Sequence, residues 1–192
     1  MSLEERTSQR DLVRRGYDAI SHSYRGDEET SGVARVESSA DYRAWVDELG
    51  VLLQPGARVL DLGCGAGIPA TRLLTESGFG VVGVDFSEVQ ISRARALVPG
   101  ATFICADMVL WEGDASSFDA VVSFYAFIHL PLEDQRPLFS RIAQWLRPNG
   151  YLLAIVGHGE WTGTEDFLGA PCFGTTPIPT LISPGSAKSG YF

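Results

Sequence analysis

The 192-residue sequence has little basic charge and no long apolar run. It contains 15 Lys and Arg residues against 24 Asp and Glu, which gives a formal net charge of -9. Nucleic acid is therefore not an expected partner, because phosphate binding needs a basic surface. No run is long enough to span a bilayer, and the N-terminal "MSLEERTSQRDL" lacks the apolar centre of a signal peptide. We predict a cytoplasmic protein without a membrane partner.

Cysteine is also scarce. Cys64, Cys105 and Cys172 are odd in number and share no spacing typical of metal ligands. We expect reduced thiols, as in the cytoplasm, and no metal site.

Apolar segments alternate with helical patterns along most of the chain. The predicted strands are residues 57–62, 80–85, 101–107, 118–125 and 151–157. Three predicted helices are residues 8–25, 69–76 and 133–146. A fourth is capped by Ser38 or Ser39 and ends at Gly50. A fifth begins at Ser87, with Gln90 three residues later as a candidate capping box. This order predicts an α/β fold: a doubly wound, Rossmann-like, mostly parallel sheet covered on both faces. The chain is one domain, with N-terminal helices in 1–50, a core in 51–157 and an irregular tail in 158–192.

The most informative stretch is "VLDLGCGAGIPA", which runs from the first strand into Gly63, Gly65 and Gly67. Ligands of doubly wound sheets bind at the carboxyl ends of the strands, where glycines let a ligand approach the backbone. A tight strand-to-helix turn is the simpler alternative. The dinucleotide fingerprint would place its third glycine at Ile68, and Asp61 would repel a diphosphate. The loop therefore favours a ligand with a cationic amino group, and an NAD-linked oxidoreductase is disfavoured.

Acidic residues end the next two strands. Asp85 closes the second strand, where an acid accepts hydrogen bonds from ribose hydroxyls, and Phe86 beside it suits packing on a base. Asp107 ends the third strand and could accept from an exocyclic amine, while the Met108 N–H meets a ring nitrogen. A helix cap for Asp85 and a turn position for Asp107 are the alternatives.

The segments "VLDLGCGAG", "VVGVDFSEVQISRAR", "ATFICADM" and "FDAVVSFYAFIHLP" resemble the successive motifs of the class I S-adenosylmethionine-dependent methyltransferases. The resemblance covers about residues 11–157 and is to the small-molecule branch, which often begins with a lid helix like "VRRGYDAISHSYR". It implies glycines around the methionine part, Asp85 on the ribose, and Asp107 and Met108 on the adenine. The implied cofactor-binding residues are Tyr17, Tyr24, Asp61, Gly63, Cys64, Gly65, Gly67, Asp85, Phe86, Ser87, Asp107, Met108 and Phe124.

The reaction implied is in-line methyl transfer from S-adenosylmethionine to a small-molecule acceptor, for which alignment and exclusion of water are the main requirements. His129 is the candidate general base, or else a structural cap of its loop. No Asn-Pro-Pro-Tyr-type motif for amide or adenine amines is present. The residues expected near the acceptor are Ser123, Phe124, Tyr125, Trp161 and Phe167.

The C-terminal segment departs from the family pattern. The family's sheet usually continues with another helix and an antiparallel hairpin, whereas this chain ends in "APCFGTTPIPTLISPGSAKSGYF". Reading residues 172–192 one nucleotide earlier permits Met-Phe-Trp-Asn-Asp-Ala-Asp-Thr-Tyr, which resembles the start of the family's next helix. We predict a frameshift or truncation after about Pro171, with a natural divergent tail as the alternative. An uncovered sheet edge would then favour a homodimer. A cofactor-binding module with little or no catalysis is the second functional hypothesis.

Overall fold

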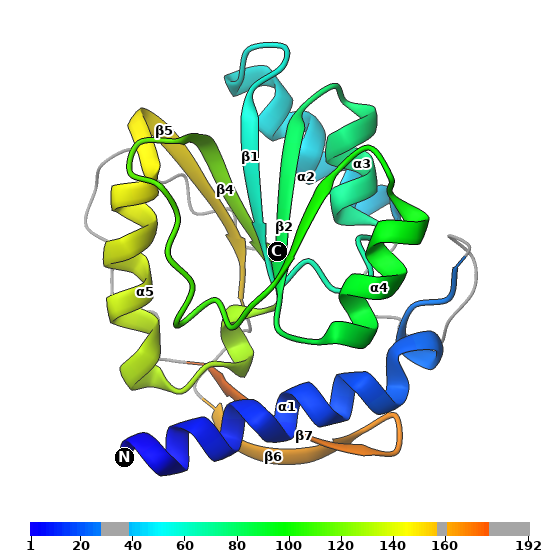
Figure 1. Cartoon of the computed structure of the whole chain (residues 1–192), viewed down its shortest axis with the longest axis vertical. Coiled ribbons are helices and arrows are strands. Elements are labelled where there is room, and N and C mark those ends of the chain that lie inside the picture. Colours follow the sequence, from blue (N-terminus) through cyan, green and yellow to red (C-terminus); the bar gives the residue numbers. More distant parts are fainter. Residues whose placement is uncertain (28–38, 157–160, 177–192) are drawn as a thin grey trace.

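The computed structural model describes residues 1–27, 39–156 and 161–176, and its centre is a five-stranded parallel sheet (Figure 1). The strands lie in the order β3-β2-β1-β4-β5. Their bounds are β1 (Arg58–Leu62), β2 (Gly80–Asp85), β3 (Thr102–Cys105), β4 (Phe118–Phe124) and β5 (Leu146–Ile155). β1 pairs in parallel with β2 and β4. The chain reverses its winding between these neighbours, so the predicted doubly wound sheet is confirmed.

Helices cover both faces of this sheet. On one face, α2 (Ser39–Leu52) and α3 (Ala70–Glu76) pack on apolar residues of β1, β2 and β4. On the other face, α5 (Leu132–Trp145) and the short helix η1 (Phe127–His129) pack around Leu60, Leu62 and Val121. α4 (Glu88–Leu97) packs on Phe103 of β3. Because α2 belongs to a sheet layer, only α1 has the place expected of a lid.

α1 (Leu3–Tyr24) runs across the carboxyl ends of the strands, at the bottom of Figure 1. It starts earlier than predicted because Ser2 and Glu5 form a capping box that satisfies free N–H groups of the first turn. The capping box predicted for α4 is only half present. The Ser87 hydroxyl accepts from the Gln90 N–H, but the Gln90 side chain accepts a hydrogen bond from Ser21 of α1 instead.

The prediction of an irregular tail is wrong for residues 161–176. β6 (Trp161–Phe167) and β7 (Ala170–Thr176) form an antiparallel hairpin that packs against α1 (Figure 1). The hairpin is stabilised by burial of Cys172 and Phe173 against Val13 of α1, a contact that the local sequence pattern does not reveal. Residues 177–192 lie outside the described residues, and the frameshift stays a prediction.

The fifth strand also begins earlier than predicted. Leu146 already pairs with Phe118 of β4, and the register then shifts before Ala120 meets Tyr151. Asn149 takes a positive φ of 65° inside this irregularity, which lets the "RPNG" segment remain within the strand.

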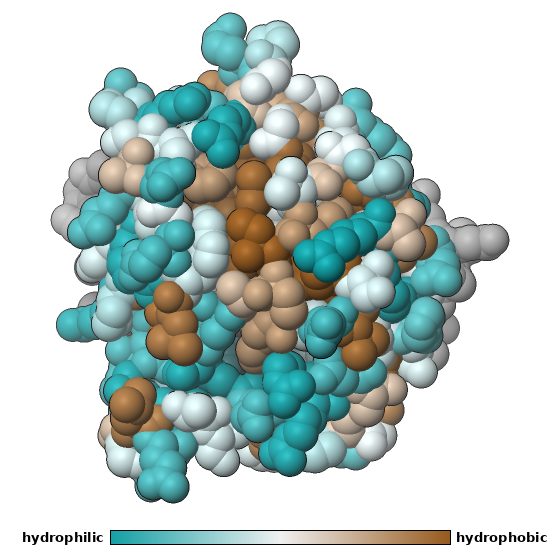
Figure 2. All heavy atoms as spheres, in the orientation of Figure 1, coloured by the Kyte–Doolittle hydropathy of each residue, from teal (hydrophilic) through white to brown (hydrophobic). Residues whose placement is uncertain are grey.

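One face of the molecule carries an apolar area at its centre. Figure 2 shows brown side chains between α4 and α5, where the connection from β3 to β4 crosses, with hydrophilic residues around them. No helix in the described part of the chain is both long and apolar enough to cross a bilayer. The three cysteines are free, with Cys64 and Cys172 buried and Cys105 exposed.

Candidate functional site

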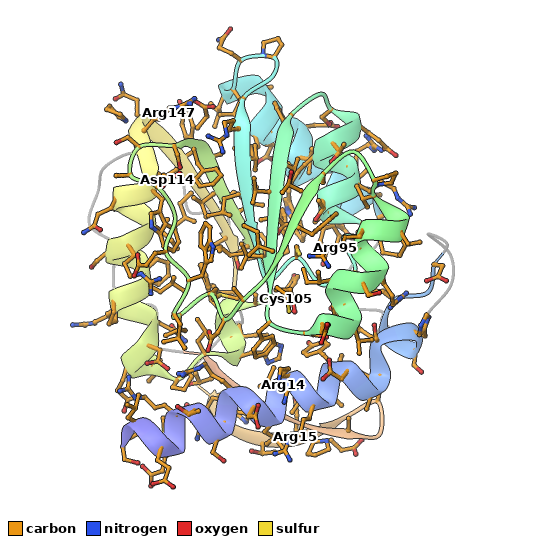
Figure 3. All side chains as sticks on the ribbon, in the orientation of Figure 1. Arg14, Arg15, Arg95, Cys105, Asp114 and Arg147 are labelled. Carbon is orange, nitrogen blue, oxygen red and sulfur yellow. The ribbon has the colours of Figure 1, made fainter. Side chains whose placement is uncertain are left out.

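A cavity lies between the carboxyl ends of the strands and α1. Its empty space, including the open solvent at its mouth, is about 710 Å³. Cys105, labelled in Figure 3, marks the end of β3 on the side that faces α1. The residues that line the cavity are Arg10, Val13, Tyr17, Tyr24, Gly63, Gly65, Asp85, Phe86, Gln90, Asp107, Met108, Phe124, Tyr125, Ala126, His129 and Leu130. Ten of the predicted site residues are among them.

The three glycines of the loop after β1 all have positive φ, but they serve different contacts. A Cβ at Gly63 would lie 2.2 Å from the Ala126 Cβ, and one at Gly67 would meet Val98 and Phe103. A Cβ at Gly65 would meet nothing within 4 Å, and this residue lines the cavity. Gly63 and Gly67 are thus required by packing, whereas Gly65 leaves the backbone open to a ligand.

Asp85 is fixed at the end of β2 by main-chain donors. Its carboxylate accepts hydrogen bonds from the Gly65 N–H and the Ser87 N–H, each at 2.9 Å. Burial raises the pKa of Asp85 to about 6, although both hydrogen bonds act to lower it. The glycine loop and this acid therefore form one rigid wall of the cavity.

Asp107 follows β3 and forms the opposite end of the cavity with Met108. One carboxylate oxygen accepts from the Val109 N–H at 2.9 Å, and the other accepts from Nε of Arg10 in α1, also at 2.9 Å. Arg10 also pairs with Asp134 of α5. An ion pair thus joins the lid helix to the acid at the end of β3.

A second, smaller cavity shares Gly63, Gly65 and Phe124 with the first and adds Asp61 and Arg25 to its lining. Asp61 is buried and accepts a hydrogen bond of 2.6 Å from the Thr71 hydroxyl. Burial raises its pKa to about 7. Arg25 lies over the rings of Tyr24 and Tyr42. One carboxylate and one guanidinium therefore border the same space.

His129 lies under the lid helix with both ring nitrogens engaged. Nδ1 lies 2.8 Å from the Phe173 carbonyl oxygen, which can only accept, so Nδ1 carries the proton. Nε2 then accepts from the Tyr17 hydroxyl at 2.9 Å. Burial lowers the pKa of His129 and raises that of Tyr17. The pair is accordingly a neutral imidazole and a protonated phenol.

Several predicted residues lie outside the main cavity. Cys64 and Asp61 line only the smaller cavity. Gly67 packs on α4, and Ser87 caps α4 while its hydroxyl bonds to Asp18.

Of the residues expected near the acceptor, only Phe124 and Tyr125 line the main cavity. Ser123 is buried, with its hydroxyl on the Leu62 carbonyl. Phe167 packs on Tyr17 and Tyr24 from the hairpin, and Trp161 lies at the start of β6; neither lines the main or the smaller cavity.

Sequence reasoning missed Arg10, Arg25 and the Phe173 carbonyl. A signal for Arg10 was present, because it shares the helical stripe of Val13 and Tyr17 that faces the core. A charged residue on a buried stripe needs a partner of opposite charge. The Phe173 carbonyl left no sequence signal, since any residue supplies a carbonyl.

A methyltransferase-domain family model matches residues 59–150, the segment that supplies β1 to β4 and the acids at their ends. Residues 59–150 are a class I methyltransferase domain. The match spans the glycine loop, Asp85 and Asp107, the groups that the structure gathers around one cavity.

Known proteins resemble this methyltransferase domain and its flanks. A sterol 24-C-methyltransferase of Yarrowia lipolytica is 30% identical over 154 residues, which cover 77% of this chain and 37% of that protein. The structure resembles a phosphoethanolamine N-methyltransferase 2 of Haemonchus contortus, with a TM-score of 0.64 and 27% identity over 76% of this chain and 35% of that one. An S-adenosylmethionine-dependent methyltransferase of Mesorhizobium loti has a TM-score of 0.53 and 31% identity, over 68% and 63% of the two chains.

The chain thus spans about a third of the length of the sterol methyltransferases that it matches, from 30% to 37%. The Haemonchus structure contains phosphomonomethylethanolamine and S-adenosylhomocysteine, which places ligands in a protein of the same fold.

Proposed function

We propose that this chain is an S-adenosylmethionine-dependent methyltransferase that transfers the methyl group in line to a small-molecule acceptor. The observation that carries the proposal is the meeting of Gly65, Asp85 and Asp107 around one cavity beneath a lid helix. The sterol and phosphoethanolamine relatives are in keeping with a small acceptor. No observation favours the module without catalysis.

The cavity fits the nucleoside part of the cofactor. The Asp85 carboxylate can accept from both ribose hydroxyls, and the open space at Gly65 admits the sugar next to the backbone. Asp107 and the Met108 N–H can pair with the amine and a ring nitrogen of adenine, and Phe86 offers a ring to the base. These groups can recognise adenosine by its pattern of hydrogen-bond donors and acceptors, and none of them is a binding site for phosphate.

The smaller cavity fits the amino-acid end. A cationic ammonium would favour the ionised form of Asp61, and the Arg25 guanidinium suits a carboxylate. The two cavities share Tyr24, Gly63, Gly65, Gln90 and Phe124, so one extended ligand can occupy both.

The bound cofactor supplies a methyl carbon that its sulfonium has already activated. The chain's own residues then have to align the acceptor and exclude water, an effect that can account for much of a rate enhancement. α1 covers the cavity, and the rings of Tyr17, Tyr24 and Phe124 line it. Aromatic faces also stabilise a neighbouring cation.

Tyr17 and His129 are the pair that could take up a proton released by the acceptor on the side of the cavity next to α1. The basic Nε2 of His129 is reached through the Tyr17 hydroxyl, so a proton from an acceptor would pass to the Tyr17 oxygen while Tyr17 gives its own to Nε2. The lowered pKa of His129 makes it a weak base. We therefore assign His129 to orienting Tyr17, and a strong general base is not part of the proposal.

The deciding experiment is calorimetric titration of the full chain with S-adenosylhomocysteine, with NAD as the control ligand. We expect binding of the first ligand only, and a loss of at least about tenfold in affinity in Asp85→Asn, because a charge-assisted hydrogen bond contributes about 1.5–3 kcal/mol. Asp114→Asn is the matched control, since Asp114 lies at the end of the molecule away from α1 (Figure 3).

Binding of NAD, or equal binding by Asp85→Asn, would contradict the proposal. Turnover is then measured with a panel that includes a sterol and phosphoethanolamine. Tight binding without methyl transfer to any acceptor would favour the module without catalysis.

A further inference from the structure

Arg10 has an unusual position for a charged residue. Its side chain is only 6% exposed, although it lies in the middle of a helix on the outside of the sheet. It reaches two acids on different elements: Nε donates to Asp107 after β3, and Nη1 donates to Asp134 in the first turn of α5. Arg10 also lines the main cavity.

The two acids differ in how many groups besides Arg10 stabilise their charge. Asp134 has a second arginine, Arg6, which pairs with its other oxygen, and its place at the start of α5 already favours a negative charge. In the part of the chain that the structure describes, the Asp107 carboxylate has only Arg10 and the Val109 N–H as hydrogen-bond partners. Arg10 is thus the part of this cluster that connects the lid helix to a cavity wall.

Stability alone does not account for such a contact. A buried ion pair often contributes little net stability, because removing both charges from water offsets their attraction. A guanidinium held at Nε and Nη1 does, however, fix the orientation of the carboxylates it binds. Each oxygen of Asp107 keeps a further lone pair for a ligand.

We propose that Arg10 is a positioning residue for recognition of the cofactor's base. It holds the Asp107 carboxylate in the orientation that accepts the exocyclic amine, and it does so from α1, so lid closure and base recognition are coupled. The inference rests on the proposed function and extends it to a residue that does not itself contact the reacting atoms.

The test compares two ligands, S-adenosylhomocysteine and its inosine analogue, in which an oxygen replaces the exocyclic amine. The wild-type chain should prefer the adenosine ligand by about tenfold or more, since the oxygen would face a carboxylate. In Arg10→Gln the preference should fall to about threefold or less, because Asp107 can then turn away from the base. Calorimetry measures both affinities.

Arg6→Gln is the matched control, because Arg6 shares Asp134 with Arg10 but has no contact with Asp107. It should keep the wild-type preference. Hydrogen exchange gives a second readout: the adenosine ligand should protect the amides of α1 in the wild type and in Arg6→Gln, and much less in Arg10→Gln. If Arg10→Gln does not fold, Arg10→Lys replaces it, since a single ammonium cannot reproduce both contacts, and an intermediate preference is expected.

Equal weakening of both ligands by Arg10→Gln would overturn the inference, because Arg10 would then act on lid stability alone. An unchanged preference would also overturn it. If the wild-type chain binds neither ligand, the proposed function itself fails, an outcome that is distinct from both.

Discussion

At the scale of single residues, Gly63 shows why the loop after β1 is rich in glycine. Its φ is +75°, and a Cβ there would lie 2.2 Å from the Ala126 Cβ. We expect Gly63→Ala to lower the free energy of unfolding by about 3 kcal/mol or more, from the sum of backbone strain and overpacking. Gly56→Ala is the control, with φ +77° and nothing within 4 Å, and it should cost about 1–2 kcal/mol. Urea denaturation measures both; equal costs would mean that Ala126 yields without penalty.

Asp61 gives a prediction about pH. Burial raises its pKa to about 7 from an ordinary 3.8, so between these values the folded state binds a proton that the unfolded state has released. Its contribution therefore makes the free energy of unfolding fall as the pH rises from about 4 to about 7. The free energy of unfolding of Asp61→Asn should equal that of the wild type near pH 4. At pH 8 it should be higher by a few kcal/mol, with about 1.4 kcal/mol per unit of pKa shift as the upper limit. Denaturation without ligand at both pH values tests this, and a constant difference would contradict it.

His129 gives a spectroscopic prediction. The nitrogen shifts of its ring at pH 7 should report a proton on Nδ1 and none on Nε2, because Nδ1 faces the Phe173 carbonyl. Tyr17→Phe should raise the pKa of His129, since the Tyr17 hydroxyl donates to Nε2 only while that nitrogen is unprotonated. Nuclear magnetic resonance titration of the wild type and of Tyr17→Phe checks both. A proton on Nε2 at pH 7 would contradict the assignment.

At the scale of elements, Arg93 of α4 makes several contacts with the end of α1, beside the Ser21–Gln90 and Ser87–Asp18 hydrogen bonds. Arg93 donates to the Ser21 carbonyl and hydroxyl and to the Arg25 carbonyl at the end of α1, and it also pairs with Asp27. Arg93→Met should lower the free energy of unfolding by about 2–4 kcal/mol and speed hydrogen exchange in the last turn of α1. Arg95→Met replaces an exposed arginine of α4 that makes one hydrogen bond, to the Phe103 carbonyl of β3 (Figure 3), and should cost less than about 1 kcal/mol. Similar effects of both variants would argue against this connection.

The elements also show how far the sequence could predict the structure. β1 to β4 and the acids at their ends were predictable, because buried parallel strands are continuous apolar runs and their carboxyl ends must meet at one edge. The hairpin was missed because β6 is mostly exposed and β7 is held by contacts with α1, more than a hundred residues away. The contact of Arg10 with Asp107 was missed for the same reason: it exists only once α1 has crossed the sheet.

At the scale of the whole molecule, the predicted homodimer remains a prediction. Among the described residues, β5 pairs with β4 on one side only, and Leu152 and Val156 near its end are 39% and 51% exposed. An open edge of this kind favours association. We expect sedimentation to report a dimer that Leu152→Lys weakens, whereas Val51→Lys at the exposed end of α2 should have no effect. A monomer at all concentrations would contradict the prediction.

The group that fixes the proton on His129 is a main-chain oxygen of β7. Main-chain oxygens are common to all residues, so a substitution in the hairpin that keeps its backbone path leaves the imidazole tautomer unchanged. What the hairpin must preserve is its path beside η1, which depends on backbone pairing with β6 and on the burial of Cys172 and Phe173 against α1. The protonation state of His129 therefore depends on the backbone path of the hairpin and not on which residue supplies the carbonyl.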